Sequence, residues 1–200
     1  MAEGGDHDRT ATLSRRVQAL EGLLSERGLV GEGELDDLIE RLLARTGTTQ
    51  GARVVARAWV DPGFKARLLD DANEAIAELG LDMGAGPSVQ KLVVVENTEQ
   101  VHNVIVCTLC SCYPIGLLGP PPTWYKDLAY RSRVVRDPRG VLSEFGLGLP
   151  DDVGIRVWDA SSELRYLVLP RRPEGTAGLS ETELAGRISR DALIGTAIVG

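Results

Sequence analysis

Hydrophobic residues in the first 80 positions recur at the spacing of an α-helix. Two narrow apolar stripes are separated by glycines at positions 28, 31 and 33, and a third helical zone covers residues 52–59. The stripes consist of Leu13, Val17, Leu20 and Leu24, and of Leu35, Leu38, Ile39, Leu42 and Leu43. Such stripes cover one face of each helix but do not form a compact core.

The next helix has a defined beginning. Asp61 followed by Pro62 is a typical N-cap and first-turn pair, and apolar residues at helical spacing continue the helix to Gly80. We therefore expect a flexible lead over 1–11 and a helical arm over 12–85. The pattern leaves open whether this arm covers the main domain or wraps a partner subunit.

Apolar runs of strand length begin beyond residue 90. We expect four strands, a Gly/Pro-rich loop after the second strand and a helix around 138–145. A capping box of Ser180 and Glu183 predicts a last helix that ends near Ser189. The expected strands are Leu92–Val95, Val101–Val106, Ile155–Trp158 and Leu164–Leu169, and the loop runs from Pro114 to Pro122. The pattern predicts an α+β fold with α/β layering, in which a layered C-terminal domain over 86–200 follows the helical N-terminal arm.

The composition narrows the class of protein. Of 200 residues, 43% are hydrophobic and 26% are charged, which is typical of a soluble globular domain. The net charge of −7 disfavours nucleic acid and anionic membranes as partners. The apolar runs are too short to span a bilayer, and the acidic N-terminus lacks the order of a signal peptide. We therefore expect a cytoplasmic protein with reduced thiols.

All three cysteines lie in the segment Val106-Cys107-Thr108-Leu109-Cys110-Ser111-Cys112. An odd number of cysteines cannot all pair within one chain, and thiolates this close together favour a soft transition metal. The segment, which we call the cysteine claw (residues 107–112), directly follows a predicted strand. Functional residues are common where a strand passes into a loop.

Four interpretations of the claw remain at this point. A structural zinc site or an iron–sulfur cluster would normally need a fourth ligand, which His102 or another chain would have to supply. A thiol–disulfide redox site would normally lie at a helix N-terminus, whereas the claw leads into Pro114 and the Gly/Pro-rich loop. The fourth interpretation is a catalytic metal whose remaining ligands are deprotonated main-chain nitrogens, with one coordination position open.

The claw resembles the metal motif of nitrile hydratase α subunits, and the similarity continues on both sides of it. The similar segments are Ala58–Lys65, Val95–Thr98, Val101–Val104, Pro121–Lys126, Tyr130–Arg136, Ile155–Asp159, Arg165–Pro170 and Asp191–Gly195. The resemblance extends from about residue 10 to residue 197, and it implies the fold of that family.

The resemblance implies a metal site and its ligands. The sulfur atoms of Cys107, Cys110 and Cys112 would bind a low-spin trivalent metal, with Cys107 opposite the open position. The main-chain nitrogens of Ser111 and Cys112 would complete the ligand set. In the family, the Cys110 position carries sulfinic acid and the Cys112 position sulfenic acid, and arginines of the β subunit hold their oxygens. Threonine at the Thr108 position accompanies cobalt and serine accompanies iron, so we expect one Co(III) per chain rather than Fe(III).

The resemblance also implies an activity, that of a hydro-lyase. The metal acts as a Lewis acid toward a nitrile. Either water or the sulfenate oxygen of Cys112 then attacks the nitrile carbon, and the imidate that forms tautomerises to the amide. Cys110, Ser111 and Cys112 are the expected catalytic residues. Activity would require one or more β-type subunits, with a third small subunit as an alternative, and a cobalt activator or chaperone that delivers the metal.

Two positions depart from the pattern of the family. Many members have tryptophan three residues after the last ligand, where this chain has Ile115, and a glutamine upstream of the strand is replaced by Ser88. Both changes make the side chain smaller. We therefore hypothesise a substrate pocket for a bulky heteroaromatic or nucleoside nitrile such as toyocamycin, with neutral repacking as the alternative.

Two other functions remain open. Thiocyanate hydrolase carries a similar cobalt claw on its γ subunit and also hydrates a C≡N group. A non-catalytic metal-binding or redox-sensor subunit is the alternative from a different class. It predicts reversible oxidation of a cysteine pair without tightly bound cobalt.

Overall fold

The structure, a computed structural model, describes residues 4–31, 34, 48–83 and 90–200. The chain divides into two compact units, Met1–Ala44 and Arg45–Gly200. In the first unit, α1 (Gly4–Glu26) confirms the first predicted helix and extends it into most of the expected flexible lead over 1–11. Gly28 adopts a φ of +65° in the turn that follows, a conformation that glycine accepts without strain. The second predicted stripe lies outside the described residues.

The larger unit begins at Arg45, before the boundary at residue 86 that the hydrophobic pattern predicts. It includes α3 (Thr48–Val60), α4 (Pro62–Asp70) and α5 (Ala72–Ala77). These helices belong to the core, because α3 packs against α6, α9 and α10, and α4 and α5 pack against β1. Gly51 permits the close approach of α3 to α6, since a Cβ there would lie 2.7 Å from Leu118 Cδ2.

The single helix expected from Pro62 to Gly80 is wrong. Asp71 has extended backbone angles and ends α4, and its side chain accepts a hydrogen bond from Glu74 N to cap α5. An aspartate in this position stabilises a helix start better than a helix interior, so the chain turns here. The predicted cap at Asp61 is confirmed, because its carboxylate accepts from Phe64 N at 2.9 Å.

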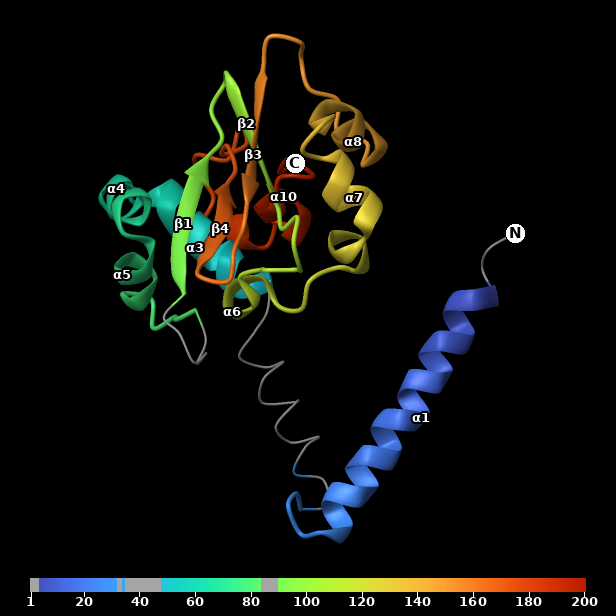
Figure 1. Ribbon diagram of the computed structural model, residues 1–200. Coiled ribbons are helices and arrows are strands. Elements are labelled where there is room, and N and C mark those ends of the chain that lie inside the picture. The colour runs from blue at the N-terminus through green and yellow to red at the C-terminus, as the bar shows by residue number, and fades with distance from the viewer. Residues whose placement is uncertain (1–3, 32–33, 35–47, 84–89) are drawn as a thin grey trace. The chain divides into compact units, whose positions relative to one another are not determined.

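In the described part of the chain, four strands form two parallel pairs, and the predicted strand positions are confirmed. They are β1 (Lys91–Glu96), β2 (Val101–Val106), β3 (Gly154–Asp159) and β4 (Leu164–Leu169). Each strand pairs with one distant in sequence, β1 with β4 and β2 with β3, and β2 also lies against β4. Figure 1 shows the strands between α4 and α5 on one side and α7 and α8 on the other.

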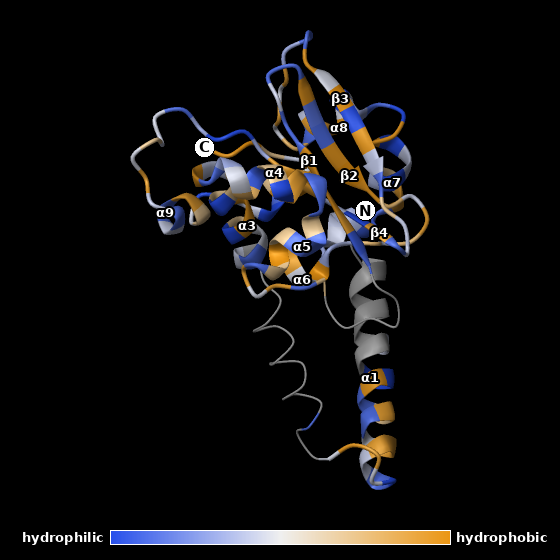
Figure 2. Cartoon of the chain, turned by 90° about the vertical axis from the view of Figure 1, so that its left-hand side faces the viewer, coloured by the Kyte–Doolittle hydropathy of each residue, from blue (hydrophilic) through white to orange (hydrophobic). Residues whose placement is uncertain are grey.

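Burial along the strands matches their places in these layers. The strands β2 and β4 are almost wholly buried, including the polar residues His102 and Asn103 of β2 and Arg165 of β4. In β3, half-buried and exposed positions alternate along most of the strand, and Figure 2 shows hydrophobic and hydrophilic residues alternating there. The chain therefore has the α+β fold with α/β layering that the hydrophobic pattern predicts.

The remaining helices among the described residues are short, and the sequence predicted only α8 and α9 of them as separate helices. They are α6 (Ile115–Leu118), η1 (Thr123–Lys126, a 3₁₀ turn), α7 (Leu128–Arg133), α8 (Pro138–Glu144), α9 (Glu181–Ala185) and α10 (Arg190–Ile194). The predicted capping box of Ser180 and Glu183 is confirmed, but the helix it opens ends at Ala185. A second helix, α10, starts where Ser189 caps it. One turn of helix, α6, lies inside the expected Gly/Pro-rich loop.

Among the described residues, no helix combines the length and apolar character that a membrane span requires.

Candidate metal centre

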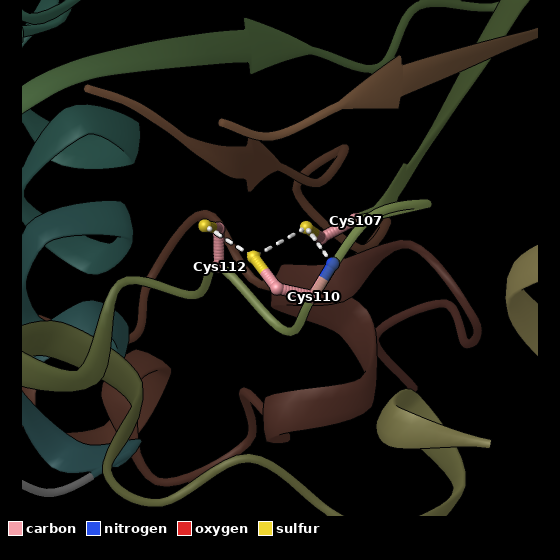
Figure 3. A group of neighbouring side chains, drawn as sticks. All are labelled: Cys107, Cys110 and Cys112. Atoms are coloured by element: carbon pink, nitrogen blue, oxygen red, sulfur yellow. Dashed lines mark hydrogen bonds between the residues drawn. The ribbon is translucent and has the colours of Figure 1, made fainter. Parts of the chain in front are cut away.

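The cysteine claw begins where β2 ends. Cys107 directly follows the strand and is fully buried, Cys112 is half-buried and Cys110 is exposed. Figure 3 shows the Cys110 sulfur between the other two sulfurs, which it approaches to 3.4 Å (Cys107) and 3.1 Å (Cys112). Within the described part of the chain, these three residues form the group whose ligand atoms lie close enough together to hold one metal ion.

The sulfur separations fit a particular coordination geometry. Two sulfurs at right angles around a metal, each about 2.3 Å from it, lie about 3.3 Å apart, whereas a tetrahedral angle places them about 3.8 Å apart. The observed separations of 3.4 and 3.1 Å match the right-angled case. The claw therefore suits an octahedral or square-based metal better than tetrahedral zinc.

Hydrogen bonds among the thiols favour one thiolate at the centre of the claw. The Cys112 and Cys107 thiols lower the pKa of Cys110 to about 7 by hydrogen bonding to its sulfur. Burial, together with the hydrogen bond to Cys110, raises the pKa of Cys112 to about 12. Because the thiolate is the form that binds metals, the lowered pKa of Cys110 favours metal binding by its sulfur.

The turn after Cys107 is held by β3. Thr108 N and Oγ1 both donate to the Asp159 carboxylate, at 2.9 and 2.6 Å. Asp159 is opposite Val106 in the register of β2 and β3, so the sheet itself brings its carboxylate to the start of the claw. Cys110 N also donates to Cys107 Sγ at 3.3 Å, which closes the turn.

Side chains from η1 and α7 bind the backbone of the claw from another side. Arg131 donates to the carbonyl oxygens of Cys107 and Thr108, and the Tyr125 hydroxyl donates to Cys112 O at 2.9 Å. Sequence reasoning assigned no role to these residues. The segments that resemble nitrile hydratase α subunits contain both, but no local spacing connects them to the cysteines.

His102 does not belong to the metal cluster. Its ring is buried, with Nε2 at 2.7 Å from Gly195 O and Nδ1 at 3.2 Å from Asn97 Nδ2. Both ring nitrogens therefore have partners in the core, and the zinc interpretation loses its candidate fourth ligand.

Comparison with known proteins agrees with this geometry. Residues 11–197 match the family described as nitrile hydratase, alpha chain. The chain belongs to the nitrile hydratase α-chain family.

Proteins similar to this chain match most of its length. The α subunit of the low-molecular-weight cobalt-containing nitrile hydratase of Rhodococcus rhodochrous is 51% identical over 93% of this chain and 88% of its own length. A double mutant of an Fe-type nitrile hydratase from Comamonas testosteroni Ni1 superposes with a TM-score of 0.88 at 44% identity, over 94% of this chain and 91% of that one. The γ subunit of thiocyanate hydrolase from Thiobacillus thioparus is 45% identical over 76% of this chain and 66% of its length.

Membership of the nitrile hydratase family, the cobalt-containing relatives and the sulfur cluster together support a metal centre in this chain. Relatives named for cobalt and for iron both match, so the choice of metal is a separate question.

Of the two residues expected to line a substrate pocket, the structure describes one, Ile115. Ile115 is the first residue of α6, three positions after Cys112, and its side chain is 45% exposed. Ser88 lies outside the described residues. Ile115 therefore follows the claw closely in the sequence and is accessible at the surface.

Proposed function

We propose that this chain is the metal-carrying α subunit of a cobalt nitrile hydratase, a hydro-lyase that converts a nitrile to its amide. The observation that carries the proposal is the cluster of three cysteine sulfurs, whose separations suit a metal with right-angled ligands. Family membership over residues 11–197 supports the same activity.

In this proposal each residue of the claw has its own part. The sulfurs of Cys107, Cys110 and Cys112 hold the metal, together with the main-chain nitrogens of Ser111 and Cys112. A bound trivalent metal supplies Lewis acidity toward the nitrile. Cys107 is buried and anchors the site, whereas Cys110 and Cys112 are accessible to oxidation.

The oxidised side chains have separate roles at the substrate. Cys110 as sulfinate and Cys112 as sulfenate present oxygen atoms to the nitrile. A water molecule held beside the Cys112 oxygen would attack the nitrile carbon and give up its protons to the nitrile nitrogen. If the Cys112 oxygen itself attacked, a water molecule would then release the product and restore the oxygen on sulfur.

Cobalt is the metal we propose, with iron as the alternative. Thr108 carries this choice, together with the 51% identity to a cobalt-containing relative.

Partner subunits complete the site in this proposal. Leu109 and Leu128 expose 87% and 73% of their side chains on the claw and on the adjacent α7. Exposed apolar side chains beside a metal site are suited to burial by another subunit. We infer a β-type subunit, with a third small subunit as an alternative, and an activator or chaperone that delivers cobalt. A cytoplasmic location remains a prediction.

Intact mass and metal analysis of the purified full chain test the proposal. We expect close to one cobalt per chain and a mass increased by three oxygen atoms, two on Cys110 and one on Cys112. The Cys110→Ala variant should lose the metal, whereas a Ser143→Ala control on α8 should keep it. Unmodified thiols in a chain that takes up no cobalt or iron, even when expressed with either metal and together with its β-type subunit and activator, would overturn the proposal.

Hydrolysis of thiocyanate is the second candidate function, because the γ subunit of a thiocyanate hydrolase is 45% identical. Steady-state assays with thiocyanate and with organic nitriles separate the two. The proposed function requires faster turnover of a nitrile.

A further inference from the structure

Four backbone carbonyls along β2 and the claw accept hydrogen bonds from one neighbouring segment. Tyr130 hydroxyl donates to Ile105 O at 2.6 Å, Arg131 donates to Cys107 O and Thr108 O, and Tyr125 hydroxyl donates to Cys112 O. All three donors lie between residues 125 and 131, on η1 and α7. These bonds extend from Ile105, the next-to-last residue of β2, to Cys112, the final cysteine of the claw.

We propose that residues 125–131 are a template that shapes the claw before metal binds, and that Arg131 is its main positioning residue. The inference deepens the proposed function, since it assigns a device for metal capture to the same site. It concerns the chain itself, so it can be tested on protein that holds no metal.

Arg131 has the chemistry that this role requires. Its Nε lies 3.0 Å from Cys107 O and its Nη2 lies 2.8 Å from Thr108 O. A guanidinium is planar and presents its donors in a fixed fork. Two consecutive carbonyls bound to one fork therefore cannot rotate independently.

The peptide between Cys107 and Thr108 is held at both of its polar groups. Arg131 binds its carbonyl oxygen, and Asp159 accepts from its N–H at 2.9 Å. A cation from α7 and a carboxylate from β3 thus act on opposite edges of one peptide plane. This arrangement sets the direction in which the chain leaves the strand, and with it the position of Cys110 relative to Cys107.

Tyr125 acts at the other end of the claw. The side chain is fully buried, with its ring edge-to-face against Tyr113 at a centroid distance of 5.1 Å. Its hydroxyl makes the bond to Cys112 O at 2.9 Å. A buried hydroxyl needs such a partner, so the bond specifies the position of the last ligand as well as satisfying the tyrosine.

Preformed sulfur positions lower the cost of metal capture. The Cys110 sulfur lies 3.4 Å from the Cys107 sulfur and 3.1 Å from the Cys112 sulfur, which are separations suited to a shared metal. Ordering six flexible residues at the moment of binding would otherwise oppose metal uptake, because each residue fixed costs conformational entropy. In this proposal the template orders the six residues of the claw when the chain folds, so their loss of conformational entropy does not oppose metal binding.

Hydrogen exchange of the full chain without metal tests the template directly. We expect Arg131→Met to accelerate exchange of the Thr108 and Cys110 amides by about tenfold or more, the equivalent of one charge-assisted hydrogen bond. Arg131→Lys keeps the charge without the fork and should give an intermediate rate. Arg133→Met is the matched control, because Arg133 lies on the same helix but binds Glu144 at the surface. It should leave exchange in the claw unchanged.

A second variant locates the effect and does not depend on Arg131. Tyr125→Phe removes only a hydroxyl and should accelerate exchange at Cys112 and Tyr113 while leaving Thr108 unchanged. Wild-type exchange rates throughout the claw in both Arg131→Met and Tyr125→Phe would overturn the template. Uniform acceleration across the whole core would also overturn it, since that result indicates a general loss of stability.

Metal uptake gives an independent readout. Loading with Co²⁺ in competition with a chelator should be slower by about tenfold or more in Arg131→Met, and unchanged in Arg133→Met. If wild-type protein takes up no cobalt or iron, the proposed function fails. The exchange measurements then still decide whether the template exists.

Discussion

Asp159 accepts two hydrogen bonds from Thr108, one from the backbone N–H at 2.9 Å and one from the hydroxyl at 2.6 Å. Asp159 is the last residue of β3, and Thr108 is the first residue after the buried Cys107. The pair ties the start of the claw to the neighbouring strand. Because serine carries the same hydroxyl, this bond does not distinguish threonine from serine, and any effect of Thr108 on metal choice must come from its methyl group.

The first prediction concerns that hydroxyl. Thr108→Val removes one donor to an exposed carboxylate and should lower the free energy of unfolding by about 1 kcal/mol. Thr108→Ser keeps the donor and should stay within about 0.5 kcal/mol of wild type. Urea denaturation of the metal-free chain measures both. A loss in Thr108→Ser without a loss in Thr108→Val would show that the methyl group, and not the bond to Asp159, stabilises the turn.

Local signals predicted the elements around the site well. The apolar run Val101–Val106 predicted β2, and the cysteines that follow it were expected at the exit of a strand, as observed. The capping box of Ser180 and Glu183 also formed as expected. In each case the determining residues lie within a few positions of one another, so the sequence alone contains the interaction.

Long-range features could not be predicted in the same way. Nothing near β1 indicates that its partner is β4, about 70 residues later, because a continuous apolar run fits any buried parallel strand. Arg131 lies in an arginine-rich segment that has the pattern of a solvated helix face, yet it binds the claw 24 residues upstream. The template became visible only when the fold brought α7 beside the end of β2.

The second prediction tests the pocket hypothesis at Ile115. Replacing this half-exposed residue by tryptophan restores the large side chain that many family members have there. Ile115→Trp should lower the turnover of a bulky heteroaromatic nitrile relative to a small aliphatic nitrile by about tenfold, because a misfitting group in a pocket costs about 1–3 kcal/mol. The measurement is the ratio of kcat/KM values for the two substrates.

Leu69→Trp on α4 is the control for this experiment, since Leu69 is also partly exposed and lies on a different element. It should leave the ratio as in wild type. A ratio unaffected by Ile115→Trp would mean that the smaller residue is neutral repacking.

The third prediction follows from the neutral state of His102. Asn97 Oδ1 accepts from Asn103 N, so Asn97 Nδ2 is the donor to His102 Nδ1, and His102 Nε2 must donate to Gly195 O. Burial lowers the pKa of His102 below its usual value near 6.5, despite the opposing effect of the bond to Gly195. The unfolded chain therefore takes up the proton at higher pH than the folded chain does.

The contribution of the neutral His102 ring to the free energy of unfolding should therefore be complete above about pH 6.5 and should decrease as the pH falls below that value. One such group contributes a slope of at most about 1.4 kcal/mol per pH unit. His102→Gln cannot titrate, so its free energy of unfolding should decline less steeply between pH 6.5 and pH 5. Because carboxylates titrate at lower pH in both proteins, the informative quantity is the difference between the two curves. Parallel curves would show that the imidazole accepts its proton equally well in the folded state.

The last prediction concerns Gly195, whose carbonyl binds His102 and whose backbone lies against β2. Its φ is +94°, and a Cβ built there would lie 2.0 Å from Asn103 O, a backbone atom of that strand. Gly195→Ala therefore combines a strained backbone with a contact that β2 can relieve only by moving. We expect a loss of about 3 kcal/mol or more in the free energy of unfolding.

Gly178→Ala is the matched control, because a Cβ at Gly178 meets nothing within 4 Å. Its midpoint of urea unfolding should be close to that of wild type. Since β2 leads directly into Cys107, a folded fraction of Gly195→Ala should also show faster amide exchange in the claw, whereas Gly178→Ala should not. A stable Gly195→Ala protein with an unchanged claw would mean that the end of α10 can move away from β2 without cost, and that this contact does not help to position the metal ligands.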